Sequence, residues 1–294
     1  MSKVSIIIPS CNEKPENLQR TLESISENAT GDIEIIVGFN GPPYQRFPST
    51  LKYPIRVSCL VENIGIKGNI NNLALMATGK YIYKTDAHCS FGKGFDEILQ
   101  QEMQPDWIVT PRFYVLDGKT WEWQDERFYD YFYLSCPFTD PRGFRFKAGG
   151  HWPERTKERL ESHPSVDETP QIHGSGWFMT KDRFFELGGF PNIDPYGHAQ
   201  EPAWLALKNW LMGGKVMVNK KTWYAHLHQD GDKKGYRYTR EEERHSYDIA
   251  AKHFVGDKGN YLHSFEWFLD KFELMPTWPE NWRVLLDQWQ EENK

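Results

Sequence analysis

Short apolar runs alternate with amphipathic segments along the first hundred residues. Residues 4–8, 33–37 and 55–61 are rich in β-branched side chains and end close to proline, asparagine or glycine, which is typical of strands. Residues 15–25 and 69–77 instead carry apolar side chains at intervals of three and four, which is typical of helices. This alternation predicts an α/β fold with a mostly parallel sheet flanked by helices, because right-handed crossovers place helices on both faces.

The same two patterns continue beyond residue 80, on both sides of a less regular middle. Residues 112–172 follow neither pattern and are rich in aromatic residues, proline and glycine. Long irregular segments in compact domains are usually functional loops or lids, so we expect a functional insertion beside a cleft. A mobile surface insertion packed by its own aromatic residues is the alternative. Further strands are expected at residues 81–85, 107–111, 176–179 and 215–218, and further helices at residues 94–104, 181–187, 202–212 and 282–289.

Composition narrows the class of protein. The chain has 294 residues and a formal net charge of −6, which gives no general attraction to nucleic acid or acidic membranes. No apolar stretch is long enough to span a membrane, and the sequence begins without a signal-peptide pattern. The four cysteines, Cys11, Cys59, Cys89 and Cys136, lack the paired spacing of a disulfide scaffold. We therefore expect a cytoplasmic protein.

The most specific candidate chemistry follows the apolar run at residues 81–85. Asp86 and His88 come directly after it, and His226 and His228 lie far downstream. Residues i and i+2 of a strand point to the same side, so the Asp86 carboxylate and the His88 imidazole can converge on one ion. Oxygen and nitrogen ligands, with room for phosphate oxygens, suit a manganese-like cation that holds a diphosphate. Such ligands bind beyond the carboxyl ends of strands. An isolated Asp-x-His pair is more often an ordinary loop pair, so the prediction depends on the downstream histidines.

Several further blocks of sequence occur in a characteristic order. Residues 5–13, 62–71 and 77–82 are similar to the first strand, the nucleotide-binding turn and the approach to the metal motif of GT-A glycosyltransferases of the family 2 type. That family usually has Asp-x-Asp where this chain has Asp-x-His, which more closely resembles the polypeptide N-acetylgalactosaminyltransferase branch. The narrower resemblance continues through residues 174–179, 185–190 and 201–215. In all, the resemblance covers most of residues 3–228.

The resemblance implies a metal-dependent enzyme that takes a hexose or N-acetylhexosamine from a nucleotide diphosphate sugar, with UDP as the expected nucleotide. It implies a GT-A catalytic domain at 1–228, with 112–172 on the acceptor side, and a C-terminal lid and helical extension at 229–294. His228 is either an alternative metal ligand or a residue that supports the ligands. The implied site residues are Asp86, His88 and His226 as ligands of Mn²⁺ or Mg²⁺, Pro9, Asn12, Glu13 and Asn40 around the nucleoside, Lys67 as a further contact, and Gly174 and Gly176 beside the donor sugar. Each of the nucleoside residues is an ordinary turn residue on its own, and the two glycines could equally serve tight turns.

Glu201 is the leading carboxylate of the acceptor cleft. In inverting members of the wider family, an acidic residue near this point removes the proton of the acceptor hydroxyl. In the retaining branch, the matching glutamate mainly orients sugar and acceptor. The Asp-x-His motif with His226 favours retention. Alternatively, Glu201 only complements the helix dipole, because Pro202 resembles a proline at the first position of a helix.

Two departures from the family concern the donor base and the acceptor. The second strand normally ends in an acidic pair that recognises uracil, whereas this chain has Gly38-Phe39-Asn40-Gly41. The Asn40 amide can still pair with a base edge, since it offers both donor and acceptor. We expect no sugar-binding β-trefoil after the catalytic domain and carry over no mucin-type acceptor. The acceptor, whether glycan, protein or modified nucleic acid, stays open.

Three alternatives compete with this interpretation. A phage-type enzyme that glycosylates modified DNA bases is supported only by basic residues at 142–147 and at Lys233, Lys234, Arg237 and Arg240, which could also form a lid over a diphosphate. A non-catalytic nucleotide-sugar-binding protein would be expected to lose some of the motif residues. A nucleotidyltransferase usually has a glycine-rich phosphate loop early in the chain, and the turn at residues 9–13 contains no glycine.

Overall fold

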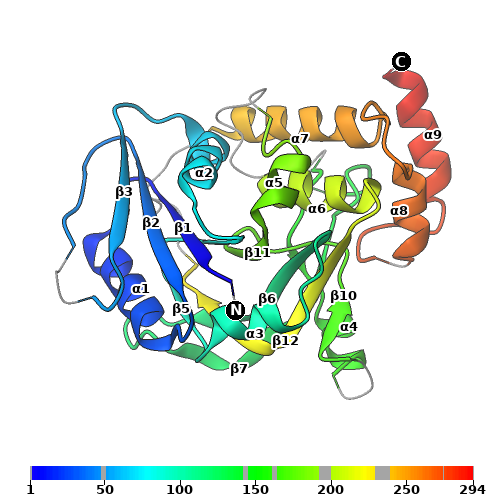
Figure 1. Ribbon diagram of the computed structural model, residues 1–294. Helices are drawn as coiled ribbons and strands as arrows, with labels where there is room; N and C mark the ends of the chain where they lie inside the picture. Colours follow the sequence, from blue (N-terminus) through cyan, green and yellow to red (C-terminus); the bar gives the residue numbers. More distant parts are fainter. Residues whose placement is uncertain are drawn as a thin grey trace.

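The computed structural model describes residues 2–47, 51–141, 145–160, 164–191, 200–228, 239–273 and 275–293, with the side chains of 124–126 excepted. This part of the chain forms a large mixed sheet covered by helices on both faces (Figure 1). The predicted α/β class is confirmed. No helix in the described part combines the length and the apolar character that crossing a bilayer requires.

The strands and helices predicted in the first hundred residues are all present. The strands are β1 (Val4–Ser10), β2 (Ile33–Asn40), β3 (Ile55–Leu60), β4 (Tyr81–Thr85), β5 (Cys89–Phe91), β6 (Trp107–Leu116), β7 (Trp123–Tyr129), β8 (Phe132–Tyr133), β9 (Gly150–His151), β10 (Val166–Glu168), β11 (Gly176–Thr180) and β12 (Lys215–His226). The helices are α1 (Pro15–Asn28), α2 (Gly65–Met76), α3 (Phe95–Gln101), α4 (Pro153–Glu158), α5 (Lys181–Glu186), α6 (Glu201–Leu211), α7 (Arg240–Phe254), α8 (Phe265–Lys271) and α9 (Trp282–Glu292).

The sheet has the order β10-β12-β6-β11-β4-β1-β2-β3. The pairs β4–β1, β1–β2, β2–β3 and β12–β6 are parallel, and β11 runs antiparallel between β4 and β6. In parallel strands the carboxyl ends meet at one edge, so the residues that follow β1, β2 and β4 lie at the same edge of the sheet. The short strand β5 then pairs antiparallel with the end of β12 and sets His226 opposite Cys89. This register brings a residue from late in the chain beside the segment that follows β4.

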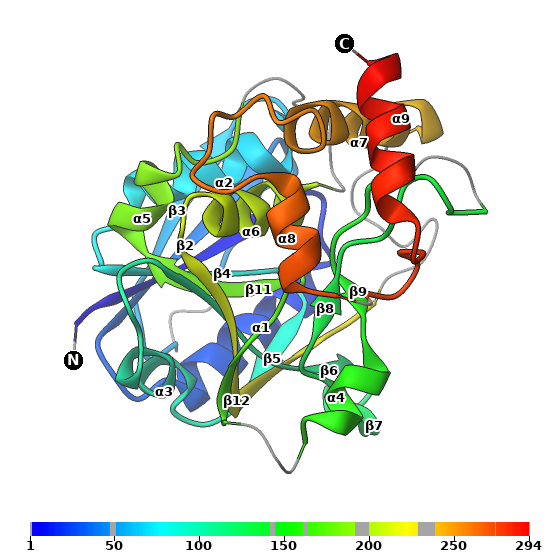
Figure 2. The same ribbon diagram turned by 90° about the vertical axis from the view of Figure 1, so that its right-hand side faces the viewer.

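Two buried apolar clusters lie on opposite faces of the sheet. Successive side chains of β1 alternate between them, because neighbouring residues of a strand point to opposite faces: Ile6 and Ile8 join the cluster with α1 and α3, and Ile7 joins the other. Figure 2 shows α1 and α3 on one side of the sheet and α2, α5 and α6 on the other. Leu18, Leu22 and Ile25, the predicted inner face of α1, are fully buried.

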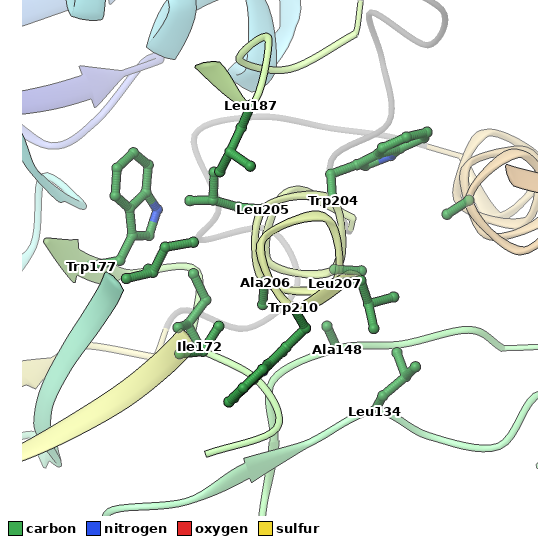
Figure 3. Close-up of a cluster of buried hydrophobic side chains, with 14 of the residues drawn as sticks. Leu134, Ala148, Ile172, Trp177, Leu187, Trp204, Leu205, Ala206, Leu207 and Trp210 are labelled. Atoms are coloured by element: carbon green, nitrogen blue, oxygen red, sulfur yellow. The ribbon is translucent and has the colours of Figure 1, made fainter. Parts of the chain in front are cut away.

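Helix α6 is buried on every side. Figure 3 shows it end-on, with Trp177 and Leu187 on one side and Leu134 and Ala148 on another. Its own residues from Glu201 to Leu207 are all buried, and a helix that is apolar all round belongs in a core. The position of Glu201, at the start of α6, is therefore fixed by packing.

The segment 112–172 is more regular than its sequence suggests. Strand β6 continues to Leu116 instead of ending near Pro111, and β7, β8, β9, α4 and β10 follow. Tyr131, Phe132 and Trp152 are buried in the clusters on the two faces of the sheet. The expectation of an irregular segment was wrong, because these strands pair with β6 and β12 and with each other, through contacts that local periodicity does not reveal.

The C-terminal helices α7 and α8 were not predicted, whereas α9 was. Tyr247 and Phe254 of α7, Phe265 of α8 and Leu286 of α9 are buried in the same cluster as Trp204 of α6. Thr239 begins α7 with a capping box, in which its hydroxyl accepts from the Glu242 N–H and the Glu242 carboxylate accepts from the Thr239 N–H. The predicted lid residues Lys233, Lys234 and Arg237, and also Arg142, lie outside the described residues.

Candidate active site

Asp86, His88 and His226 meet at the carboxyl-end edge of the sheet. The ligand-type atoms of the three side chains all lie within 4.8 Å of one another. His226 Nε2 lies 3.1 Å from His88 Nε2 and 3.2 Å from Asp86 Oδ2. The position of His226 follows from the pairing of β12 with β5, and the Leu227 N–H donates to the His88 carbonyl at 3.0 Å. The three residues singled out in the sequence therefore share one site.

The spacing of these atoms fits a divalent cation. Two ligands in neighbouring positions of an octahedral ion, each about 2.1 Å from it, lie about 3 Å apart, close to the two measured separations. Burial lowers the pKa of His226 to about 4, and the hydrogen bond that Asp86 accepts from this ring only partly opposes the shift. The imidazole of His226 is therefore neutral near pH 7, as a metal ligand must be. Its Nδ1 is buried without a hydrogen-bond partner among the described residues.

Glu13 holds the His88 ring in place. Its Oε2 lies 2.7 Å from His88 Nδ1, and an ionised carboxylate can only accept, so Nδ1 carries a proton. A neutral His88 then directs the lone pair of Nε2 towards His226 and Asp86. Carboxylates that orient metal-binding histidines in this way are a recurrent feature of metal sites. The structure thus places Glu13, expected at the nucleoside, against a candidate ligand.

Lys84 is a central residue that the sequence interpretation missed. Its Nζ lies 2.6 Å from Asp86 Oδ1, 2.5 Å from the Gly174 carbonyl and 3.1 Å from Glu201 Oε1. Burial alone would lower the pKa of Lys84, but Asp86 and Glu201 more than offset that effect and raise it. Burial alone would likewise raise the pKa of Asp86, and Lys84 and His226 hold it well below its usual value. A charged Lys84 inside the apolar run of β4 was itself a signal, because buried charges need partners.

Glu201 is connected to Asp86 through Lys84, whose ammonium donates to both carboxylates. Burial raises the pKa of Glu201, although the positive charge of Lys84, and more weakly that of Lys67, opposes the shift. Lys67 is itself buried in α2. Lys84 and Lys67 therefore both lower the pKa of the Glu201 carboxylate. Through Lys84, Glu201 is also connected to the candidate metal site.

The other expected nucleoside residues are spread over the ends of β1 and β2. Pro9 is buried in β1 opposite Gly38, and Asn12 is exposed with φ 48°. The side chain of Asn40 is engaged within the protein: its Nδ2 donates to Asn63 Oδ1 at 2.7 Å and its Oδ1 accepts from the Ile64 N–H at 2.9 Å. A base contact by Asn40 would have to replace one of these bonds.

The two glycines occupy different surroundings. A Cβ on Gly176 would lie 2.7 Å from ring atoms of the buried Tyr224, so this glycine is required for packing. A Cβ on Gly174 would face Pro202 at 3.1 Å and Glu201 Oε1 at 3.3 Å. The Gly174 backbone therefore lines the Lys84–Glu201 side of the site, and the Gly176 position contacts strand β12.

His228, expected near the metal ligands, joins a second group of histidines with His151 and His173. Their ligand-type atoms also lie within 4.8 Å of one another. The two groups adjoin, because the His226 and His228 ring centroids are 4.9 Å apart. The sequence interpretation did not single out His151 or His173, which occur alone in segments without a metal-ligand spacing.

Comparisons with known proteins show the family of the chain. The family model described as Glycosyl transferase family 2 matches residues 5–174. A curated Drosophila melanogaster relative with the provisional name polypeptide N-acetylgalactosaminyltransferase 13 is 25% identical over 237 residues, which are 74% of this chain and 40% of that protein. Polypeptide N-acetylgalactosaminyltransferase 5 of Caenorhabditis elegans is 24% identical over 233 residues, 74% of this chain and 36% of its own length. The chain thus spans less than half of the curated relatives it matches.

A solved structure has the same fold. The crystal structure of GalNAc-T7 with UDP, GalNAc and Mn²⁺ superposes with a TM-score of 0.70 at 17% sequence identity. The superposition covers 92% of this chain and 56% of that one. At this identity, the likeness concerns the fold alone, and it confirms the expected GT-A architecture.

Proposed function

The chain belongs to glycosyl transferase family 2, and from this premise we propose that it is a metal-dependent glycosyltransferase. It moves a hexose or N-acetylhexosamine from a nucleotide diphosphate sugar to an acceptor hydroxyl. The observation that carries the proposal is the convergence of Asp86, His88 and His226 within 4.8 Å. They lie where sheets of this kind bind nucleotides, beyond the carboxyl ends of parallel strands.

The three side chains are proposed to hold Mn²⁺ or Mg²⁺. When bound, the ion neutralises the diphosphate as the bond to the sugar breaks. Glu13 keeps the His88 ring oriented. The ammonium of Lys84 pairs with the Asp86 carboxylate, so that this carboxylate stays ionised. A mixed set of one carboxylate and two imidazoles suits manganese better than a purely nitrogen set would.

We propose UDP as the nucleotide of the donor. The GalNAc-T7 structure that shares the fold contains UDP and Mn²⁺, and the relatives are polypeptide N-acetylgalactosaminyltransferases. Pro9, Asn12 and Asn40, at the ends of β1 and β2, are proposed to surround the nucleoside. Lys67 is proposed to act on the phosphate side through its buried charge, and Gly174 to line the sugar site.

Transfer with retention is favoured. Glu201 Oε1 accepts from the buried ammonium of Lys84 at 3.1 Å, and a carboxylate engaged in this way is suited to orient donor and acceptor more than to remove a proton. We place the acceptor on the side of 112–172, and a glycan, a protein or a modified nucleic acid base remain the candidate acceptors. A cytoplasmic location stays a prediction from the sequence.

The test is a screen of nucleotide sugars with the full chain and Mn²⁺, read as donor hydrolysis and thermal stabilisation. A bound donor at a hundredfold excess over Kd stabilises the fold by about 2.7 kcal/mol. D86N, H88A and H226A should each remove the manganese-dependent part of the response. H245A is the matched control, since His245 is exposed on α7. An equal response in the D86N/H88A/H226A triple variant contradicts the site.

The competing functions give different outcomes in the same screen. A binding protein without turnover shows stabilisation by donor and no hydrolysis with any acceptor class. A nucleotidyltransferase releases pyrophosphate from a nucleoside triphosphate, which the proposed enzyme does not. An enzyme acting on DNA shows salt-sensitive DNA binding.

A further inference from the structure

A group of three histidines lies next to the candidate donor site and takes no part in it. His151 comes from β9, His173 precedes β11, and His228 follows β12. One ligand-type atom of each lies within 4.8 Å of the other two. From this convergence we propose that His151, His173 and His228 form a second cation site, which takes a zinc-class ion.

The three rings are held by aromatic packing. His151 stacks on Tyr129 with centroids 4.0 Å apart and an interplanar angle of 28°. The Phe113 ring lies against all three histidines, at centroid distances of 5.3 Å to His151, 4.8 Å to His173 and 5.8 Å to His228. A site whose ligands are held in place loses less conformational entropy on binding.

The His173 ring has a partner behind it. Its Nδ1 lies 2.6 Å from Ser175 Oγ, which lies 3.1 Å from the Tyr224 hydroxyl, and the Ser175 N–H approaches Nδ1 at 3.3 Å. The fixed Ser175 N–H makes Nδ1 an acceptor in this arrangement, whereas the Ser175 hydroxyl can rotate. Metal binding through Nε2 requires the other tautomer, in which Nδ1–H donates to Ser175 Oγ across the 2.6 Å contact.

The donor atoms distinguish this group from the neighbouring one. Asp86, His88 and His226 include a carboxylate, whereas the second group offers three imidazoles. Three histidines with an open fourth position are the ligand set of catalytic zinc sites. Nitrogen ligands favour zinc, cobalt and nickel over manganese, so the three-histidine group should prefer these ions more strongly than the mixed group does.

The place of the group indicates a use for the open position. His151 belongs to 112–172, the proposed acceptor side, and the His173 and His226 ring centroids are 5.5 Å apart. An ion here would hold an acceptor oxygen beside the donor. This use rests on the proposed function, whereas the metal site itself does not.

The metal site is tested with metal alone. The full chain is stripped of metal and titrated with Co²⁺, which reports tetrahedral nitrogen coordination by visible absorption, and Zn²⁺ is added in competition. Wild type should bind one Co²⁺ that zinc displaces. H151A, H173A and H228A should each abolish the tetrahedral spectrum, and S175A should weaken binding about tenfold or more. Mn²⁺ binding, followed by electron paramagnetic resonance, should be kept in H228A and lost in D86N/H88A.

Exposed His228 keeps the test independent of folding, since its replacement need not disturb the core, and circular dichroism of H228A verifies the fold. H245A is the control and should match wild type. The proposal is overturned if H228A and H151A both keep the tetrahedral cobalt spectrum. It is also overturned if D86N/H88A loses this spectrum while the histidine variants keep it. If no sugar donor is ever used, the cobalt result still stands, so the two proposals fail separately.

Discussion

The ammonium of Lys84 lies 3.1 Å from Oε1 of Glu201, although 117 positions separate the two residues in sequence. Both side chains are almost fully buried. Lys84 also pairs with Asp86, so one cation links the proposed metal ligand to the proposed acceptor-side carboxylate. The two halves of the site are therefore coupled through a side chain that is only 1% exposed.

Replacing Lys84 should destabilise the fold. K84M leaves the buried Glu201 and the partly buried Asp86 without their cation, and breaking a buried pair in this way costs about 3–5 kcal/mol. Urea denaturation measures the loss. K252M, which breaks the exposed Lys252–Asp248 pair, should cost less than about 1 kcal/mol. Equal losses in the two variants would show that Lys84 contributes no buried ion pair.

Glu13 should control metal affinity without being a ligand. E13Q removes the carboxylate that accepts from His88 Nδ1 and should weaken Mn²⁺ binding about 10-fold to 100-fold. Electron paramagnetic resonance of free Mn²⁺ follows the titration. The matched control is E16Q, because Glu16 is exposed in the first turn of α1, three residues after Glu13. Wild-type affinity in E13Q would mean that the 2.7 Å contact does not orient the ligand.

Glu34 should make stability depend on pH in the acid range. Burial would raise its pKa, but hydrogen bonds from Ser5, Thr78 and Arg56 lower it from 4.5 to about 2. Since the folded value is the lower one, the stabilisation is complete above about pH 5 and is lost as pH falls towards 2. The shift corresponds to about 3 kcal/mol.

E34Q tests this pH dependence. Urea denaturation between pH 7 and pH 2.5 should give a variant that is less stable than wild type at pH 7 and nearly equal to it at the acid end. A constant difference between the two proteins across this range would exclude Glu34 as the titrating group.

Gly176 should tolerate no side chain. G176A places a methyl group 2.7 Å from the ring of buried Tyr224, and overpacking of this kind costs about 1–3 kcal/mol. Thermal unfolding measures the change. The control is G68A, inside helix α2, where the added methyl would meet the flexible end of the Ile64 side chain. Its stability should change by less than about 0.5 kcal/mol. If G176A were as stable as G68A, the contact with Tyr224 would not be limiting.

Much of the fold could be predicted because the sequence patterns of its strands and helices are local. The runs that became β1, β2 and β4 bury every residue, and the spacing of Leu18, Leu22 and Ile25 identified the inner face of α1. Helix α7 had a comparable signal that was overlooked: a Thr239–Glu242 capping box and apolar Tyr247, Ala250, Ala251 and Phe254. Strands β8 to β10 had none, since each has only two or three residues, and the pairing of β7 with β6 is a tertiary contact.

The sequence by itself determined the alternating strands and helices, the family, and Asp86 and His88 as a candidate motif after β4, and the resemblance implied His226 as a third ligand. Only the tertiary structure decided that these three side chains meet around the bend between β4 and β5, that Glu13 supports His88, that Lys84 links Asp86 to Glu201, and that His151, His173 and His228 meet. These contacts depend on the register of β12 against β5 and on the pairing of Lys84 with Glu201, both of which join residues more than a hundred positions apart. Periodicity records which side a residue faces, but not which distant residue lies there.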